Sequence, residues 1–371
     1  MKKRFICFII LASTLILTSC YNYKDVNRMF FLTAFGIDVD EDDNVVAYGE
    51  VFVAGRKAGE LQGKEEAVTF MNKGKTIFQA IRNMNLNSRY PISFVMNRAI
   101  LFSEKAAMKG MDDYLDFLLR DQESLIRQHI FIACCPLEEL IKIEMEEDKF
   151  VGIFLNLLMQ NEKALANTSE TTFGEFMLNK SLGSKINVIN MIGLHQNPSY
   201  QGIDIKGLAV IQDDKMVGKM SLEEGRFYRH FQGLKHKGTI NVTNPEKPGK
   251  HVILESESSK TKGKIYYDGK TIHVIRTVNV RASFAGSEGG INLQENAIRE
   301  AIEAEVEKIV EEGCMELFRK FKEQGIDVFN LKAAIEKKYP ELATEDFLDK
   351  VKVKVIANVK IDGSSDITNY Y

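Results

Sequence analysis

The sequence has no tryptophan, only six prolines and only five cysteines among its 371 residues. Two of the cysteines lie in the first twenty residues, which leaves Cys134, Cys135 and Cys314 for the rest of the chain. Three thiols in a chain of this length exclude a disulfide framework. Cys134 and Cys135 end a strand-like apolar run, and adjacent cysteines bridge only with backbone strain, so we expect buried, unpaired thiols. Stability must therefore come from hydrophobic cores.

Motifs for catalysis and for metal binding are also missing. The six histidines, His230 and His236 included, are scattered, and no HxxxH, HExxH or CxxC spacing occurs. No G-x-S-x-G elbow, Walker loop or G-x-G-x-x-G follows a predicted strand. We therefore predict no catalytic residue, no metal site, no cofactor and no enzymatic activity.

An acidic run at residues 40–44 has a functional interpretation and a plainer one. An EF-hand loop counted from Asp38 needs glycine at its sixth position and glutamate at its twelfth, where Asp43 and Gly49 stand. A solvated hairpin turn between two strands, at 30–39 and 45–53, is favoured because Asp and Asn tolerate left-handed backbone.

Two further polar clusters each have a functional interpretation and a plainer one. The glycines at 286–290 could hold an anion at a helix N-terminus, but Glu288 and Glu295 would repel phosphate, so a loop is favoured. Glu144 and Glu146 could form an acid pair, yet contiguous carboxylates at a helix end are usually solvated. We assign no chemistry to either cluster.

Composition and charge exclude one class of partner. The chain is 44% hydrophobic and 27% charged, with a formal net charge of −3 at pH 7. A mildly acidic chain without a basic block is a poor nucleic-acid binder, so we expect no nucleic-acid partner. Beyond the first twenty residues, no apolar run approaches the length of about 20 residues that a transmembrane helix needs.

The first twenty residues indicate where the chain resides. A basic head, Lys2 to Arg4, precedes an apolar run from Phe5 to Leu17, and small residues then lead to Cys20. These are the parts of a secretory signal peptide, and the cysteine at the boundary makes a bacterial lipobox. The alternative is an ordinary signal peptide with an accidental cysteine. We predict that residues 1–19 are removed and that Cys20, acylated with chains such as palmitate, is the membrane anchor.

The remaining chain is too long for one core, so two or three domains are expected. Strands alternate with short helices as far as residue 194, which is typical of an α/β unit. We predict a mixed α/β fold of three domains: residues 20–197 as an N-terminal α/β region, 198–290 as a middle β-rich region, and 291–371 as a long helix plus a strand.

Local patterns place individual elements. Ser221 and Glu224 can form a capping box for a helix at 222–231. Other helices are expected at 64–87 and 106–119, and strands at 205–211, 216–220, 238–242, 251–256, 265–267 and 271–284.

A long amphipathic pattern between residues 293 and 321 predicts the most prominent helix. Ile302, Val306 and Ile309 lie at the centre of its apolar stripe, with Glu303 and Glu307 off it. A helix of this length spans about 40 Å, enough to cover a sheet. A coiled coil is possible, but a strand at 351–361 favours packing within the chain.

Four stretches carry a resemblance in their order and spacing. They are CYNYKDVN (20–27) with TAFGID (33–38), RAILFSE (98–104) with DYLDFLLRD (113–121), KGLAVI (206–211) with VG (217–218), and the long helix followed by GIDVF (325–329). Together they resemble the Ger(x)C family, the lipoprotein C subunits of spore germinant receptors. Two positions depart from the family pattern: Tyr21 stands where tryptophan is usual, and 329–331 replaces a Gly-Phe-Gly-like turn.

The resemblance implies three α/β domains and a receptor subunit without enzymatic activity. Its implied partners are the integral membrane A-type and permease-like B-type subunits, and its implied location is the outer face of the inner spore membrane. Two other classes stay open. An extracytoplasmic lipoprotein that binds a small ligand usually has an aromatic-lined cleft, and a chain without tryptophan gives no sign of one. A cell-envelope hydrolase is disfavoured because no nucleophile and base motif occurs.

Overall fold

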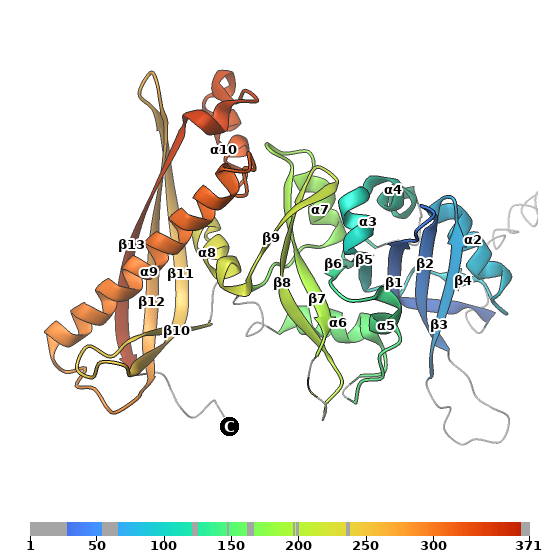
Figure 1. Ribbon diagram of the computed structural model, residues 1–371, viewed down its shortest axis with the longest axis horizontal. Coiled ribbons are helices and arrows are strands. Elements are labelled where there is room, and N and C mark those ends of the chain that lie inside the picture. The colour runs from blue at the N-terminus through green and yellow to red at the C-terminus, as the bar shows by residue number, and fades with distance from the viewer. Residues whose placement is uncertain are drawn as a thin grey trace, which may run out of the picture.

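The computed structural model describes residues 28–53, 66–120, 125–146, 148–161, 167–195, 197, 200–234 and 238–364. These residues form two lobes that lie side by side along the longest axis of the molecule (Figure 1). The first lobe is built on a nine-stranded sheet and the second on a four-stranded sheet. In the described part of the chain, no helix has the length and apolar character needed to cross a membrane.

The first lobe alternates strands and short helices. Its strands are β1 (Phe30–Val39), β2 (Val45–Val53), β3 (Glu66–Gly74), β4 (Ile92–Ser93), β5 (Ala99–Ser103), β6 (His129–Ala133), β7 (Ile186–Leu194), β8 (Ile203–Gln212) and β9 (Lys215–Met220). Its helices are α2 (Ile77–Leu86), α3 (Glu104–Lys109), α4 (Asp112–Arg120), α5 (Leu137–Ile141), α6 (Val151–Gln160) and α7 (Phe173–Asn179).

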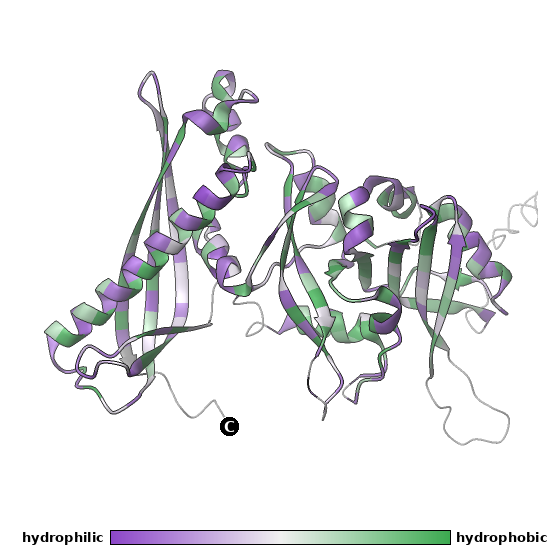
Figure 2. Ribbon diagram, in the orientation of Figure 1, coloured by the Kyte–Doolittle hydropathy of each residue, from purple (hydrophilic) through white to green (hydrophobic). Residues whose placement is uncertain are grey.

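The sheet of the first lobe is covered on both faces. Its strand order is β3-β2-β1-β5-β6-β7-β8-β9, parallel from β1 to β7 and antiparallel at both ends. Helices α2, α3, α4 and α7 bury apolar side chains on one face, and α5 and α6 cover the other. Strands buried on both faces are mostly apolar, and β5 and β6 carry only one polar residue each, Ser103 and His129 (Figure 2).

The second lobe uses fewer and longer elements. They are α8 (Leu222–Gln232), β10 (Gly238–Thr243), β11 (His251–Tyr267), β12 (Ile272–Ser287), α9 (Asn296–Lys322), α10 (Leu331–Lys338) and β13 (Val351–Ser364). The strand order is β10-β11-β12-β13, and β12 and β13 are parallel because α9 crosses over between them. Figure 1 shows α9 running across the front of this sheet.

One hydrophobic core joins the two lobes. Buried side chains of β7, β8 and β9 pack with those of α8, α9 and the second sheet. Phe321 of α9, which is fully buried, lies against Gly218 of β9. Within the same core, Gly313 of α9 allows the close approach of α8, because a Cβ there would lie 2.3 Å from the Phe227 ring. The apolar stripe of the long helix therefore contacts both lobes.

Several sequence predictions are confirmed. The fold is mixed α/β, and the long helix packs on a sheet beside β13. The capping box of Ser221 and Glu224 is formed, with the Ser221 Oγ accepting from the Glu224 N–H at 3.1 Å. The acidic run at 40–44 is a hairpin turn between antiparallel strands β1 and β2, in which Asp40 Oδ1 accepts the Asn44 N–H at 2.9 Å.

Three local predictions are wrong. The helix predicted at 64–87 is strand β3 followed by α2, because β3 pairs along its whole length with β2 and Thr76 caps the helix. The helix predicted at 106–119 is interrupted at Gly110, whose φ of 137° is incompatible with helix. The strands predicted at 251–256 and 265–267 are one strand, β11, since the polar residues between them continue the pairing with β12.

Strand pairing also groups the chain differently from the three expected regions. Strands β8 and β9 follow the expected boundary at residue 198, yet they pair with β7 in the first sheet. Strand β13 follows the boundary at 290 and pairs with β12. The division into three domains stays a prediction, and the two sheets define the lobes described here.

Carboxylates of α9 bind the edge of β13 that pairs with no strand of the sheet. Glu303, Glu307 and Glu311 accept the backbone N–H groups of Ile361, Val359 and Ala357 at 2.8, 2.9 and 2.9 Å. The spacing matches because four helical residues rise about 6 Å and two strand residues about 6.6 Å. Glu303 and Glu307 are thus off the apolar stripe, as expected, but they bind the sheet edge.

Candidate functional site

The predicted lipid-attachment residue, Cys20, and the leader before it lie outside the described residues. Their assignment as anchor and signal peptide stays a prediction from the sequence. The described chain offers four other features that bear on function: an open pocket, an acidic groove, and two buried carboxylates.

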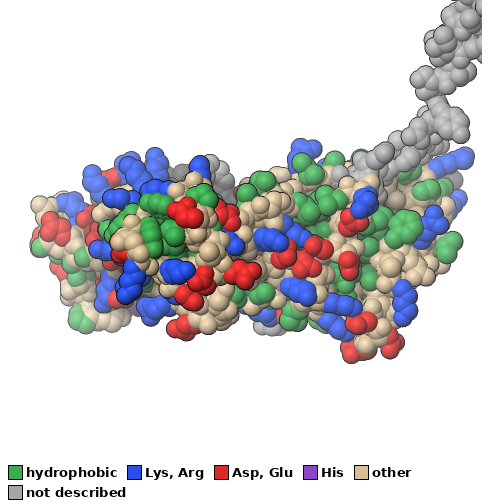
Figure 3. All heavy atoms as spheres, turned by 90° about the horizontal axis from the view of Figure 1, so that it is seen from above, with side chains coloured by type: hydrophobic (Ala, Val, Ile, Leu, Met, Phe, Trp, Pro, Cys, Tyr) green, Lys and Arg blue, Asp and Glu red, His purple; other side chains and the backbone are tan. Residues whose placement is uncertain are grey.

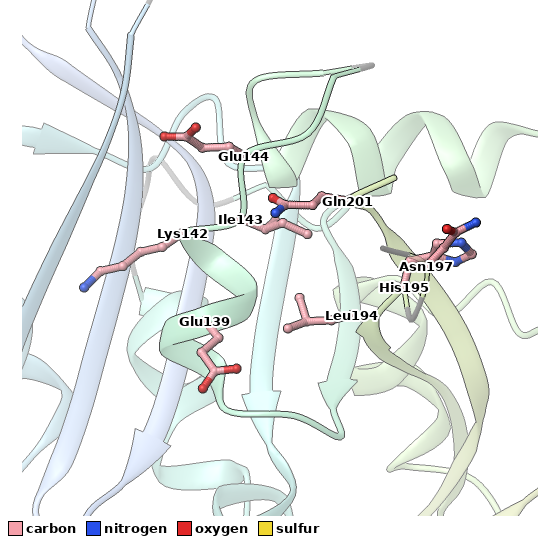
Figure 4. Close-up of a pocket in the computed structure, with 8 residues that line it drawn as sticks. All are labelled: Glu139, Lys142, Ile143, Glu144, Leu194, His195, Asn197 and Gln201. Carbon is pink, nitrogen blue, oxygen red and sulfur yellow. The ribbon is translucent and has the colours of Figure 1, made fainter. Parts of the chain in front are cut away.

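The pocket lies between α5 and the connection from β7 to β8 (Figure 4). It encloses about 620 Å³ and is lined by Glu139, Lys142, Ile143, Glu144, Leu194, His195, Asn197 and Gln201. Asp204, which does not line the pocket, holds the His195 ring, whose Nδ1 lies 2.8 Å from Asp204 Oδ2. Lys206 Nζ also binds that oxygen, at 2.9 Å. Charged groups of both signs around an apolar centre suit a small polar molecule.

The two adjacent cysteines lie near this pocket, at the end of β6. Cys134 Sγ donates to the Ile192 carbonyl at 3.1 Å, and both thiols are free. The expectation that they are buried is wrong: Cys134 is exposed and Cys135 half-buried, because β6 ends at Ala133. Desolvation by the surrounding protein raises the pKa of both thiols, so neither is an activated nucleophile.

The acidic groove runs between α8 and α9 and encloses about 400 Å³. Glu223, Glu224, Glu312 and Glu316 line it, over a floor that contains Phe227, Ile309 and Leu317. Glu312 and Glu316 are exposed, whereas Glu224 is bound by Lys320 at 2.6 Å. Ile309, predicted to be central in the core, is only partly buried because it faces this groove, and Val310 is buried in its place. Lys320 also lines the groove, and Arg226 and Lys308 lie 3.3 and 4.0 Å from Glu223 and Glu312. The groove therefore combines an apolar floor with a rim of four glutamates, of which Glu316 has no ion pair among the described residues.

One buried carboxylate, Asp327, ties the two lobes together. It is 4% exposed and accepts hydrogen bonds from Ser184 Oγ of the first lobe and from the N–H groups of Leu331 and Lys332, at 2.7 to 2.9 Å. Asn330 accepts the Ser184 N–H at 2.7 Å. Burial raises the pKa of Asp327 to about 6 despite these hydrogen bonds.

A second buried carboxylate, Glu50, holds a helix against the first sheet. It is 1% exposed and accepts from Thr33 Oγ1 at 2.5 Å and from the N–H groups of Val151 and Gly152 at 2.7 and 3.1 Å. Burial raises its pKa, while the hydrogen bonds at the N-terminus of α6 oppose that shift. Sequence reasoning missed Glu50 and Asp327; a lone acid within an apolar strand was the available signal for Glu50.

The remaining polar candidates are not brought together. Glu144 lines the pocket, Glu146 is exposed, and His230 lies in the second lobe, hydrogen-bonded to Ser259 at 3.0 Å. His236 lies outside the described residues. Gly286 lies in the last part of strand β12, and Gly289 and Gly290 lie in the turn after it, several residues before α9 begins. Among the residues that the structure describes, no group of three or more His, Cys, Asp or Glu is arranged to hold a metal ion.

Comparison with known proteins gives consistent matches over nearly the whole chain. Residues 22–193 match the family described as "Spore germination protein N-terminal domain", and residues 206–365 match "Spore germination B3/GerAC like, C-terminal". The chain is 21% identical to the spore germination protein GerQC of Bacillus cereus, over 98% of this chain and 99% of that protein. It is 22% identical to the spore germination protein KC of Bacillus subtilis (strain 168), over 92% and 89%.

A solved structure shares the fold. The crystal structure of the GerBC protein matches with a TM-score of 0.58 at 16% identity, covering 88% of this chain and 96% of that one. At this identity the likeness concerns the arrangement of elements alone.

Proposed function

The chain belongs to the Ger(x)C family of spore germination proteins, the C subunits of germinant receptors, and from this premise we propose that it is a lipid-anchored, non-enzymatic receptor subunit. The observation that carries the proposal is the order of the two family domains, which together cover residues 22–193 and 206–365. Its role is to assemble with integral membrane A-type and permease-like B-type subunits, so that spores respond to nutrients.

Membrane attachment in this proposal depends on Cys20. The lipobox and the short apolar leader support acylation of that residue after cleavage. One acyl chain binds a membrane only marginally, whereas the two or three of a bacterial lipoprotein anchor it stably. The anchored chain is placed on the outer face of the inner spore membrane, where confinement raises its effective concentration toward neighbouring subunits.

The acidic groove between α8 and α9 is the surface best suited to a partner subunit. Its proposed occupant is a basic segment of a membrane subunit that also carries an apolar side chain. Charge complementarity supports this choice, since exposed Glu312 and Glu316 flank an apolar floor.

Deletion of the gene, and substitution of Cys20 in its product, test the receptor role. Deletion, or Cys20→Ala in the full precursor, should abolish or strongly slow germination with the cognate nutrient, while germination triggered downstream of the receptors stays normal. A deletion strain with no second receptor for that nutrient, whose spores nevertheless respond normally, would contradict the proposal.

A paired charge reversal tests the groove. Glu312→Lys with Glu316→Lys should reduce both the nutrient response and the recovery of membrane subunits with this protein from detergent extracts. Glu300→Lys with Glu336→Lys is the matched control, because both residues are exposed and neither lines the groove. Equal loss in the two variants would show that total charge, and not the groove, matters.

The pocket at α5 supports a second candidate function, a lipoprotein that itself binds a small polar ligand. A ligand that binds only the folded chain raises the unfolding temperature by mass action. Screening amino acids and sugars against the mature chain distinguishes the two functions. A saturable shift that is lost on His195→Ala would favour ligand binding by this subunit.

A further inference from the structure

The sheet of the second lobe has one covered face and one open face. Along β13, Val353 and Val355 point into the core beneath α9, whereas Lys352 and Lys354 between them are exposed. The same alternation runs along β11, where Ser259 is buried and Lys260 is exposed. Strands of this length, 17 residues for β11, make a face about 55 Å long.

Lysines dominate this open face. The exposed cations on it are Lys260, Lys262 and Lys264 of β11, Arg281 of β12, and Lys352, Lys354 and Lys360 of β13. The strand register sets them close together, since Lys264 and Lys354 both pair with Ile275 of the strand between them. We call Lys260, Lys262, Lys264, Lys352 and Lys354 the lysine face.

Few carboxylates neutralise these cations. Asp362 binds Arg281 and Lys360 at 2.7 and 3.3 Å, and Asp268 binds His273 at 2.7 Å. Within the described part of the chain, the lysine face makes no ion pair with a carboxylate. In Figure 3 the Lys and Arg side chains of the second lobe, on the left, gather along its upper edge. The lysines of β11 and β13 lie on either side of β12 and leave the face positively charged, so the face is suited to an anionic partner.

We propose that the lysine face lies against an anionic phospholipid bilayer. A protein partner is the poorer fit, because lysine is depleted from protein interfaces, and on this face lysines flank the strand β12 on both sides. Adsorption to charged headgroups uses lysines additively. A long, open sheet face also matches an extended headgroup surface better than a compact protein epitope does.

This inference deepens the proposed function and rests on it for the nearness of a bilayer. Acyl chains on Cys20 would hold the chain at the membrane, and a polybasic surface is the second signal that makes such anchoring firm. Contact through the second lobe would lay the molecule lengthwise on the membrane and fix which of its faces meets the integral subunits.

The test uses the full mature chain from residue 20 with Cys20→Ala, so that no acyl group contributes. Sedimentation with vesicles of phosphatidylglycerol and phosphatidylcholine should show binding that weakens as salt rises. Vesicles of phosphatidylcholine alone should bind weakly. Lys352→Glu with Lys354→Glu should weaken binding to the anionic vesicles about tenfold or more.

The matched control is Lys75→Glu with Arg82→Glu, two exposed cations of the first lobe with the same change in net charge. Its binding should stay near that of the parent. Lys352→Gln with Lys354→Gln should lose less vesicle binding, and it replaces the charge reversal if that variant does not fold. Thermal denaturation shows whether each variant is folded. The proposal would be overturned if the lysine-face variant and the control variant lost vesicle binding equally. It would also be overturned if the parent showed no preference for anionic vesicles.

Two outcomes separate this inference from the proposed function. If Cys20 carries no lipid in the native protein, the anchor fails, whereas vesicle binding by the lysine face is unaffected. If the parent binds no vesicle and the Lys352 and Lys354 reversal still blocks germination, the face binds an acidic protein and the bilayer assignment is wrong.

Discussion

The two lobes cover their sheets in different ways. The first lobe buries both faces of a mostly parallel sheet beneath short helices, so its central strands β5 and β6 are almost entirely apolar. The second lobe buries one face beneath α8 and α9 and leaves the other open to carry lysines. A sheet with one free face can therefore present a charged surface without any cost to its core, which the first lobe cannot do.

The two lobes are not independent of each other. Side chains from β7, β8 and β9 belong to the same core as α9 and the second sheet, and Asp327 adds polar contacts across the junction. The following variants ask how far the two lobes behave as one unit.

Truncation of Phe321 should have the largest effect, because it empties the core between the lobes. For a fully buried phenylalanine, Phe321→Ala should cost about 3–5 kcal/mol in the free energy of unfolding. Amide hydrogen exchange should show faster opening in both lobes together. The control Phe78→Ala, at a side chain that is 52% exposed, should cost about 1 kcal/mol or less. Loss of protection in the second lobe alone would show that the lobes unfold separately.

Truncations along α9 distinguish its core face from its groove face. Ile302→Ala should cost about 2–5 kcal/mol, because Ile302 is fully buried beneath the helix. Ile309→Ala should cost about 1 kcal/mol, because that side chain lines the groove and is only partly buried. Urea denaturation measures both. Equal losses would mean that Ile302 and Ile309 are equally buried, and so that α9 is rotated about its axis.

The junction at Asp327 should make stability depend on pH. The pKa of this carboxyl rises from its ordinary value of 3.8 to about 6 on folding, so the folded chain holds the proton more tightly. Its contribution is fully present below about pH 4 and is lost as pH rises through about 6. The free energy of unfolding, compared between the parent and Asp327→Asn across this range, should show that fall only in the parent. Parallel pH profiles would exclude the shift.

Local patterns in the sequence predicted the parts of the fold that depend on local interactions. The long helix and the capping box at Ser221 follow from spacing within one segment, and both are confirmed. Strand β3 was missed because residues 66–74 also fit a helical period, and only pairing with β2 decides between the two. Pairing across residues 198 and 290 joins segments that no local pattern connects.

Among the functional features, too, some follow from a local sequence pattern and others depend on tertiary packing. The lipobox at Cys20 can be read from twenty residues, and it stays a prediction because those residues are not described. The groove and the lysine face depend on which helices pack together and on the register of β11 to β13. Glu303 and Glu307 illustrate the limit, since their position off the apolar stripe was predicted but their bonds to β13 were not.

The smallest expected effect tests how the second lobe protects its edge strand. Glu307→Ala removes the carboxylate that accepts the Val359 N–H, and a lost hydrogen bond of this kind should cost about 1 kcal/mol. Glu307→Gln keeps an acceptor oxygen and should cost less. The control Glu300→Ala, one exposed glutamate of the same helix, should stay within about 0.5 kcal/mol of the parent.

The edge matters for association as well as for stability. An uncovered strand edge pairs with other chains, so replacing Glu303, Glu307 and Glu311 together by alanine should promote self-association of the mature chain. Sedimentation velocity at rising protein concentration measures this, with a triple variant of exposed α9 and α10 residues, Glu300, Glu312 and Glu336, as the control of equal charge. If both triple variants stay monomeric and equally stable, the carboxylates along β13 do not protect its edge. If only the first associates, the second lobe keeps its sheet to four strands by carboxylates on one helix.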